Sequence, residues 1–260
     1  MNRAACRTRA TDDMSVTAAP PAAKNATAKA VFAGLPPRYD RLAYLLSFGQ
    51  DRRWRRAVVE HVTARRPARV LDVATGPAGV ALAVSRVGTP LVVGVDLNLP
   101  MLMQGKRNVS AAGKADDVLL TAGRGERLPF RDGVFDGLSF SYLLRYVDDP
   151  AATLAEMGRC LRPGATMSSL EFFVPPRLWW RLAWRLYTGA VLPVAGLLTG
   201  GPAWWRVGRF LGPSIRGHYA AYDLSWHLNA WQEAGFVEVG YRVMSVGGGL
   251  VMWGTKAGRA

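Results

Sequence analysis

The stretch VLDVATGPAGVAL, from Val70 to Leu82, decides the fold. An apolar run ends in an acid, Asp72, and enters a short turn that contains Gly76 and Gly79. A strand that leads through a glycine-containing turn into an apolar helix is typical of the first unit of a nucleotide-binding α/β fold. The glycines are too few for a dinucleotide fingerprint, so the ligand of this turn has to be argued from its surroundings.

Predicted strands and helices alternate along the chain. The apolar strands lack a clean two-residue alternation, which indicates burial on both faces, and strands that alternate with helices imply a parallel, doubly wound α/β sheet. The C-terminal segment 237–257 is predicted to form two strands joined by a Gly-rich hairpin. The predicted strands are 68–74, 90–97, 117–123, 134–144 and 165–173, and the predicted helices are 48–62, 79–87, 100–113, 150–164 and 223–235.

A second acid, Asp96, ends the next predicted strand, about 20 residues beyond the turn, where a carboxylate can accept hydrogen bonds from ribose hydroxyls. Dinucleotide sites need small residues, so that a pyrophosphate can approach the helix N-terminus. S-adenosylmethionine (SAM) has no phosphate, so Pro77 and Ala78 in place of further glycines favour SAM over NAD. A tight turn with two solvated acids and no ligand remains the alternative.

Composition places the chain among globular proteins. Half of its 260 residues are hydrophobic, enough for one domain with a sizeable core. The 33 Lys and Arg exceed the 19 Asp and Glu, and a net charge of +14 favours anionic partners, either nucleic acid or lipid. Residues 1–29 have no periodicity and are predicted to form a disordered tail, followed by one domain over residues 30–260.

Cysteine, metal and membrane signals are weak. Cys6 and Cys160 have no neighbouring ligands for a zinc or redox site, and Cys160 is predicted to be a small buried hydrophobe. We expect no metal site. The chain shows no apolar signal region and no uncharged apolar run of about 18 residues, because the candidate LYTGAVLPVAGLLTGG is too short and carries Pro193. These features predict a soluble or peripheral protein.

The segment GRGERLPFRDGVFDGLSFSYLLRYVDDP, from Gly123 to Pro150, carries a family resemblance. With VLDVATGPAGVAL and VVGVDL, it resembles the UbiE/MenG group of class I methyltransferases, which C-methylate the ring of ubiquinone and menaquinone precursors. The resemblance spans Val31 to Lys256 and includes YDRLAYLLSFGQDRRWRR, LEFFVP, FLGPSIRG and EAGFVEV. It implies a SAM-dependent methyltransferase with a Rossmann-like, seven-stranded, mostly parallel sheet and an antiparallel C-terminal strand.

The resemblance also implies site residues. Arg145 would lie at the acceptor ring, with Tyr146 and Asp148 as further catalytic candidates and Tyr142 as a secondary one. The cofactor-binding residues that it implies are Asp72, Gly76, Pro77, Asp96, Leu97, Arg124, Gly125 and Ser141.

This chain departs from the family pattern at several positions. Pro77-Ala78-Gly79 replaces the usual Thr-Gly-Asp, and Ala43 and Ala165 replace an asparagine and a glycine. Tyr146 replaces an asparagine where the acceptor should bind. SAM binding should survive these changes, because most SAM contacts in the family are to backbone, whereas Tyr146 leaves the acceptor open.

Methylation of an aromatic carbon needs an electron-rich ring, which is usually obtained by deprotonating a ring hydroxyl. A phenol has a pKa near 10, so a base, or a cation that stabilises the phenolate, assists the reaction. Arg145 is the predicted cation, or the group that holds a proton-accepting water. His218 is a candidate base, although a structural role is the more common one for a lone histidine.

The segment 177–217 is predicted to form a helical insertion rich in Trp and Arg. One interpretation is a lid that packs its aromatics on the core. The other places Trp179, Trp180, Trp184, Trp204 and Trp205 at a bilayer interface, with arginines at anionic headgroups. The sequence therefore predicts a cytoplasmic protein, with peripheral contact at the inner face of the cell membrane left open.

Three functions compete at this point. The first is SAM-dependent C-methylation of a lipophilic quinol, for which the family resemblance implies the demethylmenaquinol type. The second is methylation of another hydrophobic phenol, lipid or secondary metabolite. The third is nucleic-acid binding, which the leucine- and glycine-rich run beside the basic aromatics disfavours. Nucleic acid is not an expected partner, and the chain is expected to be a monomer or a homodimer.

Overall fold

The structure is a computed structural model that describes residues 43–44 and 46–258, so the tail expected at residues 1–29 lies outside the described residues. The strands are β1 (Arg69–Val73), β2 (Leu91–Asp96), β3 (Val118–Ala122), β4 (Phe135–Ser141), β5 (Leu161–Phe172), β6 (Phe236–Met244) and β7 (Gly249–Lys256). The helices are α3 (Gln50–Thr63), α4 (Gly79–Arg86), α5 (Leu99–Ala111), α6 (Pro150–Arg159), α7 (Leu178–Leu186), α8 (Leu192–Gly200), α9 (Pro202–Ala221) and α10 (Leu224–Glu233).

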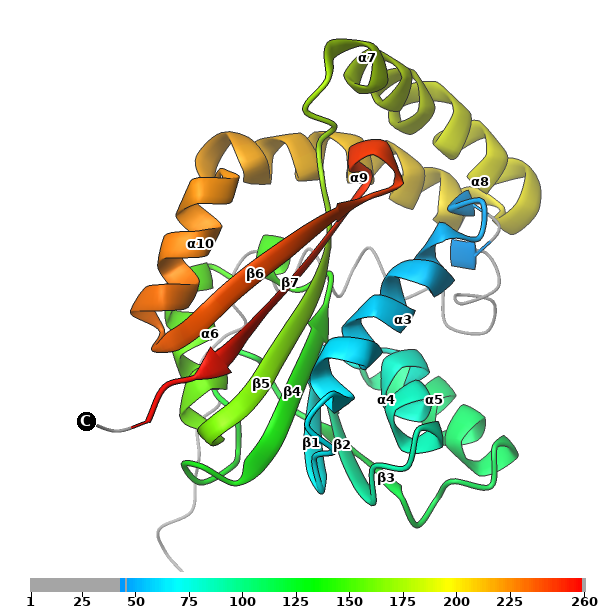
Figure 1. The fold of residues 1–260 in the computed structure, drawn as a ribbon. Coiled ribbons are helices and arrows are strands. Elements are labelled where there is room, and N and C mark those ends of the chain that lie inside the picture. The colour runs from blue at the N-terminus through cyan, green and yellow to red at the C-terminus, as the bar shows by residue number, and fades with distance from the viewer. Residues whose placement is uncertain (1–42, 45, 259–260) are drawn as a thin grey trace, which may run out of the picture.

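The strands form one seven-stranded sheet in the order β3-β2-β1-β4-β5-β7-β6 (Figure 1). β1 pairs in parallel with both β2 and β4, and β4 pairs in parallel with β5. β7 runs antiparallel to β5 and β6. The predicted doubly wound sheet with an antiparallel C-terminal strand is confirmed. The strand order reverses at β1, which makes the carboxyl end of β1 the expected ligand position.

Helices cover both faces of the sheet, so neighbouring residues of one strand enter different cores. Val70 of β1 belongs to a cluster with side chains of α3 and α4, whereas Leu71 belongs to a cluster with side chains of α6 and α10. Val70 and Leu71 are both fully buried. Figure 1 shows α3 and α4 on one side of the sheet and α6 and α10 on the other. Burial on both faces removes the polar positions that would give a strand a two-residue pattern, which explains the continuous apolar runs.

The predicted end of the helix at 150–164 was wrong. Helix α6 ends at Arg159, not at Pro163-Gly164, and β5 begins at Leu161. Leu161 pairs with Phe135, and the register then shifts before Thr166, so the Pro-Gly pair lies in an irregular part of the strand. A bulge is one of the few places where a strand accepts proline.

A layer of helices lies over the carboxyl ends of the parallel strands (Figure 1). Helix α7, a π-helical turn at Tyr187–Val191 and α8 follow one another without a break and form one helix over Leu178–Gly200. This helix has 23 residues and a mean hydropathy of 1.2, so by length and composition alone it could cross a membrane. Pro193 lies within this helix without ending it, because the π-helical turn just before the proline changes the backbone pairing there. The helix contains Arg181 and Arg185, so it is not an uncharged run.

Candidate active site

The carboxylate of Asp72 stabilises the turn after β1. Asp72 is buried, and its two carboxylate oxygens accept hydrogen bonds from the Thr75 and Ser139 hydroxyls, both at 2.6 Å. Ser139 lies on the neighbouring strand β4, so this carboxylate links the turn to the sheet. Burial raises the pKa of Asp72 to about 6, against the opposing effect of the two hydroxyl groups. The alternative of a solvated acid in a simple turn is therefore wrong for Asp72.

The backbone of the turn differs from the expectation at one glycine. Gly79 is the first residue of α4 and has no positive φ, whereas Ala74, Gly76 and Ala78 have φ values of 56°, 55° and 65°. A left-handed alanine costs roughly 1–2 kcal/mol relative to a right-handed one. The hydrogen bonds of Asp72 and Asp96 hold this conformation in place.

Asp96 closes the turn from the next strand. Its Oδ2 accepts from the Gly76 amide and its Oδ1 from the Asn98 amide, both at 2.7 Å. The Asn98 side chain in turn caps α5 by accepting from the Met101 amide. Burial raises the pKa of Asp96, and the backbone donors oppose the shift. Asp72 and Asp96 therefore lie close together at the carboxyl ends of β1 and β2, although 24 positions separate them in the sequence.

A cavity opens beside this turn, and we call it the turn cavity. It gathers every residue that the sequence suggested for the cofactor: Asp72, Gly76, Pro77, Asp96, Leu97, Arg124, Gly125 and Ser141. Its lining includes further polar side chains that the sequence did not single out, and these are Arg55, Thr75, Asn98 and Glu126. Arg55, Thr75 and Glu126 lie within stretches that carry the family resemblance, but only the fold shows that they and Asn98 reach this cavity.

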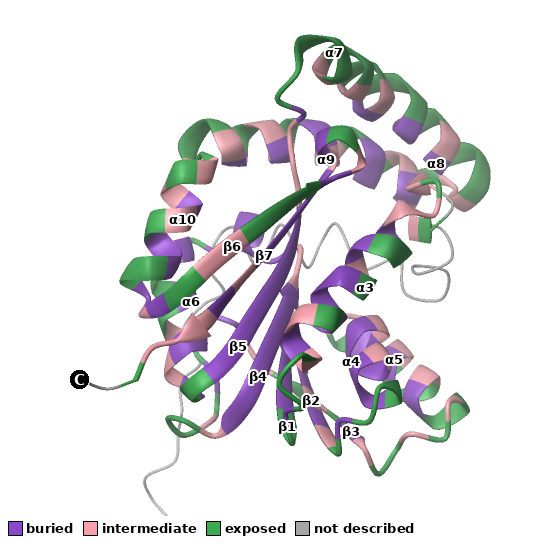
Figure 2. Ribbon diagram, viewed as in Figure 1, coloured by how far each residue is buried: buried purple, intermediate pink, exposed green. Residues whose placement is uncertain are grey.

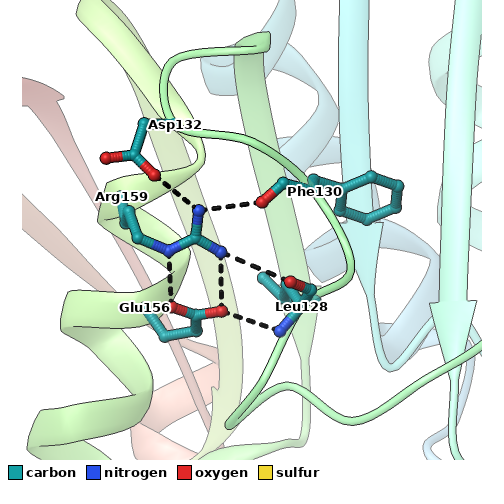
Figure 3. A network of polar contacts seen from close by, with 5 residues as sticks. All are labelled: Leu128, Phe130, Asp132, Glu156 and Arg159. Carbon is teal, nitrogen blue, oxygen red and sulfur yellow. Dashed lines mark hydrogen bonds and ion pairs between the residues drawn. The ribbon is translucent and has the colours of Figure 1, made fainter. Parts of the chain in front are cut away.

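A polar network anchors the loop that borders the turn cavity (Figure 3). The Arg159 guanidinium on α6 donates to the Phe130 carbonyl at 2.8 Å and to the Asp132 carboxylate at 2.7 Å. Arg159 also pairs with Glu156, whose Oε1 accepts from the Leu128 amide at 2.7 Å. Hydrogen bonds to Arg159 lower the pKa of Glu156. The network fixes the segment that follows Arg124 and Gly125 along the chain.

A second cavity lies under the helical layer, and we call it the apolar cavity. Its volume is about 480 Å³, within the usual range for sites that hold small organic ligands. Tyr142 and Tyr146 line both cavities, so the two share a wall. Most of the other lining side chains are apolar, among them Trp54, Phe172, Trp184, Trp204, Leu211 and Ile215.

Arg145 lines the apolar cavity as a buried cation. Its side chain is 1% exposed, and its Nε lies 3.5 Å from Oε2 of Glu171 at the end of β5. Its Nη1 and Nη2 have no hydrogen-bond partner among the described residues. The guanidinium carbon lies 5.0 Å and 5.3 Å from the ring centres of Tyr146 and Phe172. Two buried donors are thus held between aromatic rings in an apolar cavity.

Glu171 is the partner that the sequence did not reveal. Its Oε1 accepts from the Leu144 amide at 2.9 Å, so it also fixes the 3-10 turn Leu144–Tyr146 that carries Arg145. Burial raises the pKa of Glu171, and Arg145 opposes the shift. An acid within an otherwise apolar strand, as in SSLEFF, is the signal that could have identified it.

Two suggested catalytic residues lie elsewhere. Asp148 is exposed and belongs to the lining of neither cavity, because the chain turns outward where Asp149 caps α6. His218 is buried outside both linings, with its Nε2 3.1 Å from Nε2 of His227. Burial lowers the pKa of His227 to about 4. The two histidines form a structural pair between α9 and α10, and not a base at the cavity.

Of the remaining expectations from the sequence, the burial of Cys160 is confirmed and the position of Trp204 at a bilayer is wrong. Cys160 is fully buried, as predicted, and burial raises the pKa of its thiol to about 11. Trp179 and Trp180 are exposed, whereas Trp204 is buried in a small cluster with Met101. Trp204 therefore cannot meet a bilayer, because the packing of α8 on α9 encloses it.

Comparisons with known proteins agree on one class of enzyme. The demethylmenaquinone methyltransferase of Thermus thermophilus is 35% identical over 218 residues, which are 84% of this chain and 96% of that protein. The ubiquinone/menaquinone biosynthesis C-methyltransferase UbiE of Geobacter sulfurreducens is 39% identical over 168 residues, 64% of this chain and 66% of that one.

Solved structures with little sequence identity share the fold. A putative S-adenosyl-L-methionine-dependent methyltransferase from Methanococcus maripaludis matches with a TM-score of 0.58 at 14% identity, over 86% of this chain and 95% of the other. A SAM-dependent methyltransferase from Thermotoga maritima matches with a TM-score of 0.56 at 17% identity, over 88% and 99%. The sequence model of the ubiE/COQ5 methyltransferase family matches residues 21–256. The chain therefore belongs to the ubiE/COQ5 methyltransferase family and is a SAM-dependent methyltransferase.

Proposed function

We propose that this enzyme transfers a methyl group from SAM to a ring carbon of a lipophilic quinol of the demethylmenaquinol type. The observation that carries the proposal is the apolar cavity with its buried guanidinium, which shares Tyr142 and Tyr146 with the turn cavity. A donor in the turn cavity and an acceptor in the apolar cavity would meet at this wall. The names of the relatives from Thermus and Geobacter point to the same acceptor class.

The side chains of the turn cavity fit SAM. Asp72, Asp96 and Glu126 line it, and carboxylates favour the cationic sulfonium and amino groups of this molecule. Ser141 Oγ is buried and has no hydrogen-bond partner within the described part of the chain, so it is suited to a ligand contact. We assign the ribose hydroxyls to Asp96, whose oxygens each keep acceptor capacity beside one backbone donor.

The chemistry divides between the cofactor and the chain. When bound, SAM supplies a methyl group activated by its sulfonium. The protein aligns the ring carbon with that methyl group and excludes water. The Arg145 guanidinium stabilises negative charge that develops on a ring oxygen, because its Nη atoms are buried donors in a cavity lined mostly by apolar side chains.

Tyr146 favours a second candidate function. It is buried, and its ring stacks on Phe210 at a centroid distance of 6.2 Å, so it occupies space that a smaller amide side chain would leave open. Burial raises the pKa of Tyr146, which keeps its hydroxyl neutral. This altered wall is the reason to test another hydrophobic phenol, lipid or secondary metabolite as acceptor.

A panel of acceptors tests the proposal. We expect label from methyl-labelled SAM in a demethylated menaquinol, and none in the corresponding quinone, because the oxidised ring has no hydroxyl to deprotonate. The measurement is the extraction of labelled lipid from parallel reactions with quinols and with simple prenylated phenols. Transfer to a simple phenol alone supports the second candidate, and measurable SAM binding without transfer to any lipophilic phenol contradicts both.

A membrane surface is the proposed source of the acceptor. The helix over Leu178–Gly200 is mostly exposed (Figure 2), and many of its exposed residues are apolar. From Arg177 to Arg209 the chain has five arginines and no acid. Apolar anchors beside cations are typical of helices that lie in the interface of anionic lipid. The most exposed of these apolar residues are Leu178, Trp179, Leu186 and Leu198.

The triple variant Trp179→Glu/Leu186→Glu/Leu198→Glu is expected to lose most binding to anionic vesicles, because it replaces exposed apolar anchors by charges that the lipid repels. Co-sedimentation with vesicles of mixed neutral and anionic lipid measures this loss. We expect unchanged kcat/KM with a short-chain, water-soluble quinol, since these side chains line neither cavity. Vesicle binding equal to that of the wild type would refute the proposal that this helix binds a membrane surface.

A further inference from the structure

Asp51 is an acid in an apolar surrounding. It lies in the first turn of α3, is 8% exposed and lines the apolar cavity. Among the described residues that line this cavity, it is the one acid. A helix N-terminus accounts for an acid at this position in the sequence, but it does not account for a carboxylate that faces a cavity.

The carboxylate is held on both oxygens. Oδ1 accepts from the Tyr142 hydroxyl at 2.8 Å, and Oδ2 lies 2.8 Å from Nε of Arg55. The Asp51 amide donates to Ser47 Oγ at 3.1 Å. Tyr142 is itself fixed, because its ring stacks on Phe172 at 4.3 Å.

The position of Asp51 and Tyr142 at the wall between the two cavities supports a catalytic role more strongly than their burial does. Tyr142 and Arg55 both line the turn cavity, whereas Asp51 and Tyr142 both line the apolar cavity. The row Arg55–Asp51–Tyr142, joined by one ion pair and one hydrogen bond, therefore follows the wall at which donor and acceptor would meet. Arg145 lies in the lining of the same cavity, so a cation and a carboxylate both line the space proposed for the acceptor ring.

We propose that Asp51 is the general base that takes the proton of the acceptor's ring hydroxyl, and that Tyr142 is the positioning residue that fixes this carboxylate. The inference rests on the proposed function, since it names the base for that reaction. The other titratable groups of the cavity suit the task less well. Burial raises the pKa of Tyr146, and it raises the pKa of Tyr187 to about 12, so both remain neutral donors.

The protons balance in the following way. The O–H bond of the ring hydroxyl breaks and its proton passes to Asp51, while Arg145 stabilises the oxygen anion. The ring carbon then forms its bond to the methyl group as the bond from that methyl to sulfur breaks. The ring carbon loses its own proton to water, which restores the aromatic ring. Asp51 returns its proton to the ring oxygen, so each turnover releases one proton to solvent.

The test compares two acceptors in the intact enzyme. With a neutral quinol, Asp51→Asn should lower kcat by about 100-fold, and with a ring-fluorinated quinol that is already ionised at the assay pH the loss should shrink to about threefold. The asparagine keeps an oxygen for the Tyr142 hydroxyl, so the wall keeps its shape. Glu60→Gln, which removes an exposed acid from the same helix, is the matched control and should retain wild-type rates with both acceptors.

Tyr142→Phe gives a second, independent reading. It keeps the ring on Phe172 and removes one hydrogen bond, so we expect kcat to fall about tenfold with KM for the quinol unchanged. Equal losses of Asp51→Asn with the neutral and the ionised acceptor would overturn the assignment, as would full activity of both variants. A wild-type enzyme without transfer to any quinol contradicts the proposed function instead, so the two failures are distinguishable.

Discussion

The double variant Arg145→Leu/Glu171→Gln is expected to fold, to bind SAM and to lose nearly all methyl transfer. Arg145 places two buried donors in the apolar cavity without a partner in the described chain. Donors that are held ready for developing charge contribute about 10²–10³-fold to kcat, so removal of this guanidinium should cost the same factor. The loss should appear in kcat, because the charge on the ring oxygen develops only as the reaction proceeds.

Glu171 has to be changed together with Arg145 for a clear result. Arg145→Leu alone would leave Glu171 buried and unpaired, which typically destabilises a protein by about 3–5 kcal/mol. Glutamine at position 171 removes this charge and keeps an oxygen for the Leu144 amide. Thermal unfolding and calorimetric SAM titration are the controls, and both should remain close to the wild type. A double variant that retains more than about a tenth of the wild-type kcat would contradict the role of Arg145.

The variant Asp72→Asn is expected to be more stable than the wild type without ligand and poorer at binding SAM. Burial raises the pKa of Asp72 to about 6, above its usual value of 3.8. One pKa unit corresponds to about 1.4 kcal/mol, so the ionised, buried carboxylate lowers the free energy of unfolding by up to about 3 kcal/mol. An asparagine that keeps hydrogen bonds to Thr75 and Ser139 would recover part of this energy.

The pH dependence follows from the sign of the shift. Between pH 4 and pH 6 the folded state binds a proton at Asp72 that the unfolded state has released. The wild type therefore gains stability as the pH falls from 6 towards 4, and it lacks this contribution at pH 7. Asp72→Asn removes the dependence, so its advantage should be greatest at pH 7 and should vanish below pH 4.

Two measurements check this prediction. Urea unfolding of the ligand-free proteins between pH 4 and pH 7 gives the stability difference, with Asp148→Asn as an exposed control outside both cavities. SAM titration should show an affinity about 10–100-fold lower for Asp72→Asn, the usual worth of a hydrogen bond to a charged group. A variant less stable than the wild type at pH 7 would contradict the destabilising effect of burying this carboxylate. Unchanged SAM affinity would contradict a contact between Asp72 and SAM.

Much of the turn cavity could be predicted because the carboxyl ends of parallel strands meet at one edge. Asp72 and Asp96 each follow an apolar strand, so the order of elements alone brings them together. The backbone conformation of the turn after β1 could not be predicted in the same way. The glycines at 76 and 79 suggested where the chain bends, whereas Ala74 and Ala78 take left-handed conformations that tertiary hydrogen bonds stabilise.

The apolar cavity was much harder to predict. Its charged lining residues Asp51 and Arg145 come from α3 and from the turn after β4, and Glu171, which pairs with Arg145, comes from the end of β5, so only the fold brings the three into this region. Asp148 shows the opposite error. It lies three residues after Arg145, but the short 3-10 turn directs Arg145 inward, and the start of α6 leaves Asp148 at the surface.

The position of the transferred methyl group tests the central claim most directly. The enzyme would be incubated with ¹³C-methyl SAM and a demethylmenaquinol kept reduced, and the extracted product examined by NMR. The account predicts a methyl carbon bonded to the ring, together with loss of one ring C–H signal. A methyl ether on the ring oxygen, or label in no quinol product while SAM is bound, would contradict it.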